Sequence, residues 1–144
     1  MNNSSINPDG EPCTPHLVQV SIQIDPKHNN TSYSSQLTSF KGWTKSCDFP
    51  SINMAVSGYK NRYVYVGGCS GGRKSLQHFP FDIVVKLKGT EEKSVSTWWA
   101  GKRSFIGEPM FVSRSSGFRQ PYLPGFEEDN GYIVVIQLTL RLAI

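Results

Sequence analysis

The sequence predicts an all-β protein built from short antiparallel strands. Runs of β-branched and aromatic residues alternate with polar residues, which is the period of half-buried strands. Turn-forming residues separate these runs, with 13 glycines and 9 prolines in 144 residues. Long amphipathic helical stretches are absent. About six short strands with no helix between them indicate a meandering antiparallel sheet or the blades of a β-propeller.

The first part of the chain divides into a polar terminus and a first strand. Residues 1–16 are rich in Asn, Ser and Pro, so we expect them to be disordered or loosely attached, and residues 17–144 to form the β domain. Residues 17–24 alternate apolar and polar side chains, which predicts a strand. Turn residues follow at 25–30, and the weakly patterned, polar segment 31–43 is predicted to be loop.

The middle of the chain predicts a compact set of strands. Residues 48–53 are expected to form a short edge segment, limited by Pro50, and residues 62–66 a strand. Residues 82–88 form another strand, with Ile83, Val85 and Leu87 on one face and Val84 with two lysines on the other. A hairpin-like connection at 89–93 leads to a strand at 95–99.

The stretch from Gly107 to Tyr132 organises the remainder. It predicts a strand at 110–112, a long exposed loop, and a strand at 132–140. Glu108 precedes Pro109, which cannot donate to a β-ladder. The carboxylate has apolar neighbours in the sequence: Phe105, Ile106, Met110 and Phe111. We therefore expect it to be partly desolvated and to need a hydrogen-bonding partner or a nearby positive charge. Two readings remain open, a structural strand-edge glutamate paired with an amide or a lysine, and a functional one.

Composition and charge exclude several classes of protein. The net charge is +4, and the lysines and arginines are scattered rather than clustered, which does not favour a nucleic-acid binder. The three cysteines have no CxxC spacing and form an odd set, so free thiols in a reducing compartment are expected. No apolar run approaches the ~20 residues needed to span a bilayer, and no transit peptide is visible.

Four motifs in one order resemble those of a known family. They are the strings FIGEPMFV (105–112), EEDNGYIVV (127–135), CDFPSIN (47–53) and NRYVY (61–65). These resemble the GEP-x-FVPR, EDDGY, E-F-P-R-(I/V)-N and K-x-R-Y-x-Y motifs of the carotenoid oxygenase family. HFPFDIVVKL and VSTWWAGKRSFIGEP look closest to the plant carotenoid cleavage dioxygenases of strigolactone biosynthesis. The resemblance covers about residues 47–136, with a weaker extension to the strand at 17–24.

This resemblance implies a fold and an activity. The family folds as a seven-bladed β-propeller, so the chain is expected to form one to two blades of it, as an incomplete copy from the C-terminal half. The implied activity is oxidative cleavage of a carotenoid or apocarotenoid double bond with O2 at an Fe(II) centre held by four histidines. The implied location is the plastid, and peripheral membrane contact is implied for the complete enzyme.

The resemblance also assigns roles to two carboxylates. In the family, glutamates hydrogen-bond the outer nitrogens of the iron-ligating histidines, which fixes ring orientation. Those positions fall on Glu108 and on Asp48, where aspartate replaces glutamate and is one methylene shorter. None of the three histidines, at positions 16, 28 and 78, matches a ligand motif, so we expect no iron ligand and no catalytic residue within this chain. Two alternatives stay open: a catalytically dead β-rich fragment, and a small β module that binds a ligand or a partner.

Overall fold

The computed structural model describes residues 14–24, 33–39, 42–71, 79–89, 95–114 and 124–141. Within these ranges the chain is all-β, as predicted, with ten strands and one short 3-10 helix. The elements are β1 Val18–Ile24, β2 Tyr33–Ser39, β3 Cys47–Ser51, η1 Met54–Val56, β4 Tyr63–Gly68, β5 Ile83–Lys88, β6 Val95–Trp99, β7 Ser104–Ile106, β8 Met110–Ser113, β9 Gly131–Val134 and β10 Gln137–Thr139. Of the described elements, none is a helix long and apolar enough to cross a membrane.

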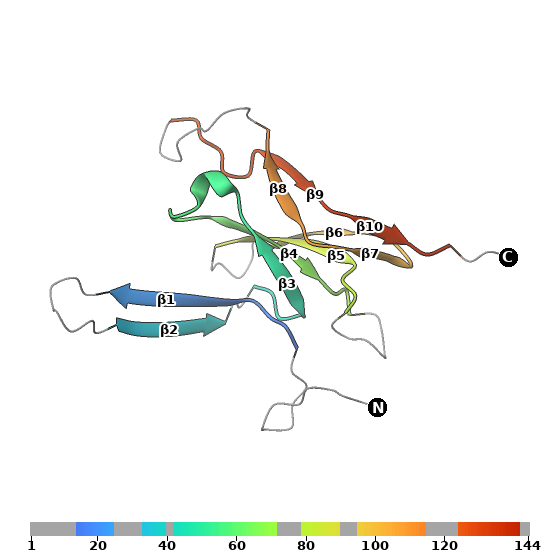
Figure 1. The fold of residues 1–144 in the computed structure, drawn as a ribbon, viewed down its shortest axis with the longest axis horizontal. Helices are drawn as coiled ribbons and strands as arrows, with labels where there is room; N and C mark the ends of the chain where they lie inside the picture. The colour runs from blue at the N-terminus through green and yellow to red at the C-terminus, as the bar shows by residue number, and fades with distance from the viewer. Residues whose placement is uncertain are drawn as a thin grey trace, which may run out of the picture.

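A four-stranded antiparallel sheet forms the centre of the molecule, in the order β3-β4-β5-β6 (Figure 1). Strands β4 and β5 lie in the interior of the sheet and are mostly buried, which explains their continuous β-branched and aromatic character. Strand β3 lies at an edge of the sheet, where Pro50 costs no ladder hydrogen bond. The predicted faces of β5 are confirmed, because Ile83, Val85 and Leu87 pack together while Val84 joins a different cluster.

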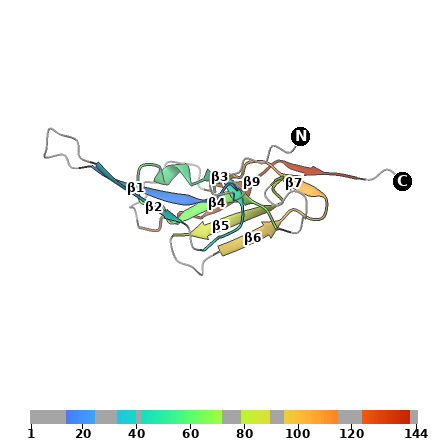
Figure 2. The same cartoon turned by 90° about the horizontal axis from the view of Figure 1, so that it is seen from below.

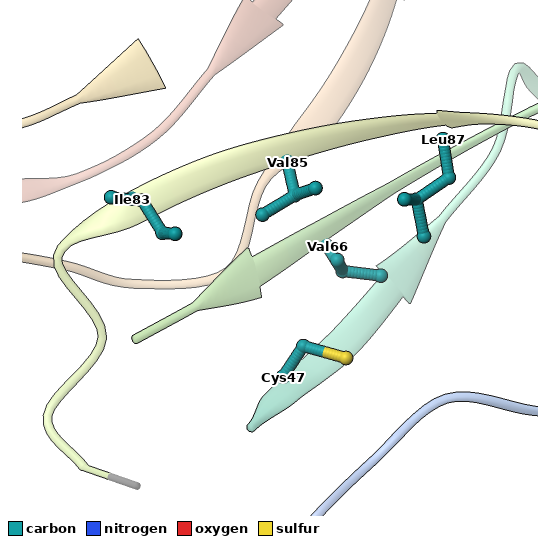
Figure 3. Packing of buried hydrophobic residues seen from close by; sticks show 5 residues of the cluster. All are labelled: Cys47, Val66, Ile83, Val85 and Leu87. Atoms are coloured by element: carbon teal, nitrogen blue, oxygen red, sulfur yellow. The ribbon is translucent and has the colours of Figure 1, made fainter. Parts of the chain in front are cut away.

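Two apolar clusters hold this sheet, one on each face. The first cluster contains Cys47, Val66, Ile83, Val85 and Leu87, contributed by β3, β4 and β5 (Figure 3). The second cluster contains Cys69, Phe81, Val84 and Ile106, with Phe49, Ala100, Ile133 and Val135 packed against it. The second cluster joins the sheet to residues that come later in the chain, so it positions the β7–β9 region.

Two small two-stranded sheets complete this region. Strand β8 pairs with β9, and β7 pairs with β10, both antiparallel. The ring of Phe111 in β8 stacks on Tyr65 in β4 at 5.3 Å, so the β8–β9 hairpin packs on the face of the central sheet opposite the first cluster. The backbone N–H of Ile106 donates to the Phe81 carbonyl (2.9 Å), which ties β7 to the start of β5.

The expected loop at 31–43 is wrong over part of its length, because β2 occupies Tyr33–Ser39. It pairs with β1 over seven residues, from Val18↔Ser39 to Ile24↔Tyr33. The residues of β2 are mostly polar, so hydrophobic periodicity does not reveal it, and the strand pairs with β1 along its whole length. This hairpin extends away from the central sheet (Figures 1 and 2).

Two further expectations need correction at the C-terminal side. Strand β7 was not predicted, and the strand expected at 132–140 divides into β9 and β10, which pair with different partners. Between them the Ile136 carbonyl accepts from the Gly107 N–H (2.9 Å). The run of strand-forming residues continues from β9 into β10, so the sequence pattern does not reveal that the two strands pair with different neighbours.

The polar terminus, expected to be loosely attached over residues 1–16, lies mostly outside the described residues. Of its described part, Pro15 accepts a hydrogen bond from the Cys47 N–H at 3.0 Å. The N-terminal boundary of the β domain therefore remains a prediction.

The outer face of the β8–β9 hairpin is apolar and exposed. It carries two cross-strand pairs, Met110↔Val134 and Val112↔Tyr132, whose members are each at least 43% exposed. Such a face in a sheet normally packs against another layer.

Candidate functional site

Glu108 lies in the turn between β7 and β8, and its backbone is firmly held. The preceding Gly107 donates its N–H to the Ile136 carbonyl (2.9 Å), and the following Pro109 is buried. Its side chain is exposed and makes no hydrogen bond or ion pair with the described residues. The expected partial desolvation is therefore wrong within this chain. Ile106 and Phe111 face the interior and Met110 faces outward, so the apolar neighbours in sequence do not enclose the carboxylate.

Asp48 lies on β3, the edge strand of the central sheet. Its Oδ1 accepts a hydrogen bond from the Phe49 N–H at 2.7 Å, and the side chain is exposed. Phe49 has φ +56°, a conformation in which non-glycine residues are uncommon. The short aspartate side chain is thus turned back onto its own strand.

Residues near each carboxylate in the sequence pack in one apolar cluster. Phe49, next to Asp48, contacts Phe81 edge to face, with ring centroids 5.6 Å apart. Ile106, two residues before Glu108, packs in the same second cluster. Asp48 lies on a strand at the edge of one sheet, and Glu108 lies two residues before β8, an edge strand of another.

The described residues do not fit an iron centre by themselves. No group of three or more His, Cys, Asp or Glu side chains lies together in the described ranges. His16 is exposed, with its Nδ1 3.1 Å from the Thr14 carbonyl oxygen. His28 and His78 lie outside the described residues.

A third carboxylate, Glu128, was not singled out from the sequence and has the most specific contacts. It is 8% exposed, and its side chain accepts from two successive backbone amides at the start of β4. The Arg62 N–H lies 2.7 Å from Oε1 and 2.9 Å from Oε2, and the Tyr63 N–H lies 2.8 Å from Oε1. Charge-assisted bonds of this kind are about twice as strong as neutral ones.

Neighbouring residues extend this contact. The Asn53 side chain donates to the Glu128 carbonyl (2.9 Å), and its Oδ1 accepts from the Ala55 N–H (2.9 Å), so it also caps η1. Asp129 pairs with Lys86 of β5 at 2.6 Å, and the Lys86 Nζ lies 4.4 Å from the centre of the Tyr63 ring. Hydrogen bonding to Lys86 holds the pKa of the Asp129 carboxyl below its ordinary value, although partial burial opposes this.

These carboxylates also affect Tyr65. Burial raises the pKa of its hydroxyl to about 12, and the charges of Asp129 and Glu128 add to this effect. Tyr65 is 2% exposed and belongs to the core, whereas Trp98 and Trp99 of the edge strand β6 are about half exposed. Of these aromatic residues, Tyr65 packs in the core, and Trp98 and Trp99 lie at the surface.

The sequence could have indicated Glu128 only through the acidic motif that contains it. An acidic residue in a turn is ordinarily solvated, and its partners are 65 and 66 residues away in the chain. The structure explains why residue 131 of the same motif is a glycine. An added Cβ would lie 2.4 Å from the Val112 carbonyl oxygen and 2.5 Å from the Phe111 ring. The motif thus requires tertiary contacts that its letters do not show.

Comparison with known proteins gives consistent matches over nearly the whole chain. The family model described as retinal pigment epithelial membrane protein matches residues 1–141. Carotenoid cleavage dioxygenase 7, chloroplastic, of Arabidopsis thaliana is 44% identical over 138 residues, covering 96% of this chain and 21% of the relative. The protein of the same name from Oryza sativa subsp. japonica is 35% identical over 128 residues, covering 89% of this chain and 19% of the relative. The chain therefore spans about a fifth of the length of these relatives.

Solved structures agree in fold. Cobalt-substituted apocarotenoid oxygenase of Synechocystis superposes with a TM-score of 0.57 at 25% identity, covering 92% of this chain and 23% of the oxygenase. The lignostilbene dioxygenase of Pseudomonas brassicacearum, at 18% identity, gives a TM-score of 0.56, covers 72% of this chain and 20% of its own, and supports the fold alone. The described sheets therefore correspond to part of the β-propeller of these oxygenases.

Proposed function

This chain belongs to the carotenoid oxygenase family, and from that premise we propose that the protein carrying it is a carotenoid cleavage dioxygenase. The proposed reaction is cleavage of one double bond of a carotenoid or apocarotenoid with O2, giving two carbonyl products. The observation that carries the proposal is the agreement with carotenoid cleavage dioxygenase 7 over 138 residues, within which the FIGEPMFV motif lies.

We assign Glu108 as a positioning residue for this reaction. Its backbone is fixed on both sides, while its carboxylate is exposed and uses none of its acceptor capacity within the described chain. A carboxylate held in this way is suited to accept the outer ring N–H of an iron-ligating histidine supplied by residues outside those described. The Fe(II) that those histidines would hold supplies the oxygen chemistry.

Asp48 is the second carboxylate that we assign to this role, and we expect it to contribute less. Its side chain is shorter than the family's glutamate, and its Oδ1 is engaged by the Phe49 N–H. A hydrogen bond to a ligating histidine would require a backbone shift or an intervening water. The substitution Asp48→Glu is therefore expected to raise iron retention relative to the natural chain.

The test uses the full-length protein that carries this chain, purified with Fe(II). Bound iron is measured by elemental analysis, and carotenoid or apocarotenoid cleavage by chromatography of the carbonyl products. Glu108→Gln is expected to lower iron affinity or activity by about 10- to 100-fold, the usual cost of losing an outer-shell partner. The acidic residue Glu127, also exposed, provides the matched control Glu127→Gln, which is expected to leave both unchanged.

The possible outcomes separate the assignments. Absence of carbonyl products with every carotenoid and apocarotenoid supplied, in a folded and iron-loaded protein, would overturn the proposed activity. Equal behaviour of the Glu108 and Glu127 variants would instead remove Glu108 from the proposed site and leave the activity in place.

We propose further that the 144-residue chain by itself neither retains iron nor cleaves carotenoids, which is the behaviour of a catalytically dead fragment. The single described histidine and the lack of a grouped metal-ligand set in the described residues support this. Stoichiometric iron with turnover in the purified chain would reverse this view. We also propose a plastid location with a role in strigolactone biosynthesis, supported by the chloroplastic relatives, and peripheral rather than spanning contact with a membrane.

A further inference from the structure

The acidic pair Glu128–Asp129 is separated from β9 by Asn130 alone and contacts the central sheet at two points. Glu128 accepts from the amides of Arg62 and Tyr63 at the start of β4. Asp129 pairs with Lys86 in β5, at 2.6 Å. We use the word latch for Asn53, Lys86, Glu128 and Asp129 together. The latch fixes the start of β9 relative to β4 and β5.

The backbone on each side of Glu108 contacts β9 or the chain just beyond it. After Glu108, the chain enters β8, which pairs with β9 from Met110↔Val134 to Ser113↔Gly131. Before Glu108, the Gly107 N–H donates to Ile136, two residues beyond the end of β9. The turn that carries Glu108 is therefore flanked by pairing with β9 on one side and by a hydrogen bond to Ile136, two residues beyond β9, on the other.

We propose that the latch positions Glu108, by setting where the β8–β9 hairpin lies on the central sheet. The chemical consequence rests on the proposed function, because Glu108 would have to meet a ligating histidine within hydrogen-bond distance. The mechanical connection does not rest on it. The latch, the hairpin and the Glu108 turn are linked by successive contacts along the chain.

The burial of Glu128 makes the latch sensitive to a small change. The carboxylate is 8% exposed and receives three short contacts from two amides. Glu128→Gln keeps the size of the side chain but removes its charge and one acceptor oxygen. At least one of the amides then loses a charge-assisted bond in a buried setting.

Hydrogen–deuterium exchange read by mass spectrometry tests the connection in the protein that carries this chain. In Glu128→Gln, peptides containing Arg62 and Tyr63 are expected to exchange about tenfold faster. Peptides containing Gly107 are expected to exchange several-fold faster as well, although Gly107 does not contact Glu128. Peptides from the β5–β6 ladder are expected to remain unchanged. The matched control is Ser70→Ala, which removes a 2.6 Å bond to the buried Asp82 beyond the other end of β4 and should not affect Gly107.

Each outcome decides the proposal. Faster exchange limited to Arg62 and Tyr63 overturns it, because the latch would then be local. A uniform increase in every peptide also overturns it, because the carboxylate would serve only global stability. If the Gln variant is recovered unfolded, Glu128→Asp keeps the charge, shortens the reach and is judged by the same three peptides. A further outcome separates the two proposals. If Glu108→Gln retains iron normally while Glu128→Gln still speeds exchange at Gly107, the role proposed for Glu108 is wrong and the positioning role of the latch is kept.

Discussion

Replacing Gly131 with alanine should destabilise the chain strongly, because there is no room for a side chain at this position. The new Cβ would lie 2.4 Å from the Val112 carbonyl oxygen and 2.5 Å from the Phe111 Cζ. The carbonyl belongs to the partner strand, and the ring is stacked on Tyr65 at 5.3 Å, so neither can move freely. Overpacking of this kind costs roughly 1–3 kcal/mol. Loss of the ring stacking adds about 0.5–1.5 kcal/mol.

We therefore expect a loss of about 3 kcal/mol in the free energy of unfolding. With a urea dependence of about 2 kcal/mol per molar, the midpoint should fall by about 1.5 M. Tryptophan fluorescence and circular dichroism of the purified chain measure this shift.

The matched control is Gly107→Ala, where the nearest atoms to a new Cβ belong to Ile136 at an ordinary 3.9 Å. This variant should change stability by less than about 1 kcal/mol, and replacing a glycine in a compatible conformation can even be favourable. The steric argument fails if the two alanine variants unfold at the same urea concentration. A Gly131 variant recovered unfolded beside a folded Gly107 variant would agree with it.

Three further predictions concern the core and the charged groups. Leu87→Ala, at a fully buried position in the first cluster, should cost about 2–5 kcal/mol in urea unfolding, and a loss under 1 kcal/mol would contradict the packing. The lowered pKa of Asp129 contributes stability that is present above its unfolded value near 3.8 and is lost as pH falls through the folded value. Lys86→Met should remove this part of the pH dependence of the free energy of unfolding, by about 0.2–1 kcal/mol because the pair is partly exposed. If the free energy of unfolding of this variant falls with decreasing pH just as in the unchanged chain, the pairing does not contribute. The raised pKa of Tyr65, about 12 against 10.0, contributes stability that is complete below pH 10.0 and is lost as pH rises to about 12, so Tyr65→Phe should flatten that alkaline decline in unfolding experiments.

The sequence predicted the two interior strands of the central sheet because their own side chains determine their burial. Strands β4 and β5 are rich in β-branched residues, and the faces of Val84 and Val85 follow from alternation alone. Strand β2 was missed because its residues are mostly polar and it forms by pairing with β1. The division between β9 and β10 was missed because a change of partner strand leaves the alternating pattern unbroken.

The candidate site shows the same division between local and tertiary information. The motif that contains Glu108 was recognisable, and its position just before a strand was predicted correctly. The exposure of the Glu108 side chain was not predicted, because the prediction rested on its apolar neighbours in the sequence. In the structure Met110 is exposed and Phe111 is buried, so these neighbours do not enclose it. Glu128 was missed because its donors, Arg62 and Tyr63, come from a distant strand.

The contrast between Glu108 and Glu128 separates the functional role that we propose for Glu108 from a folding role for Glu128, in two different motifs of the family. Glu128 is buried, and its acceptor oxygens are engaged by amides of the same chain, so its contacts account for its presence. Glu108 stands on an equally fixed backbone, yet the described residues give its carboxylate no hydrogen-bond donor. Fixing a backbone around a carboxylate without using it contributes little to the stability of this chain. We therefore propose that this rigidly placed acceptor, to which the described residues give no donor, meets a donor from residues outside them, and that the latch containing Glu128 keeps the acceptor in place.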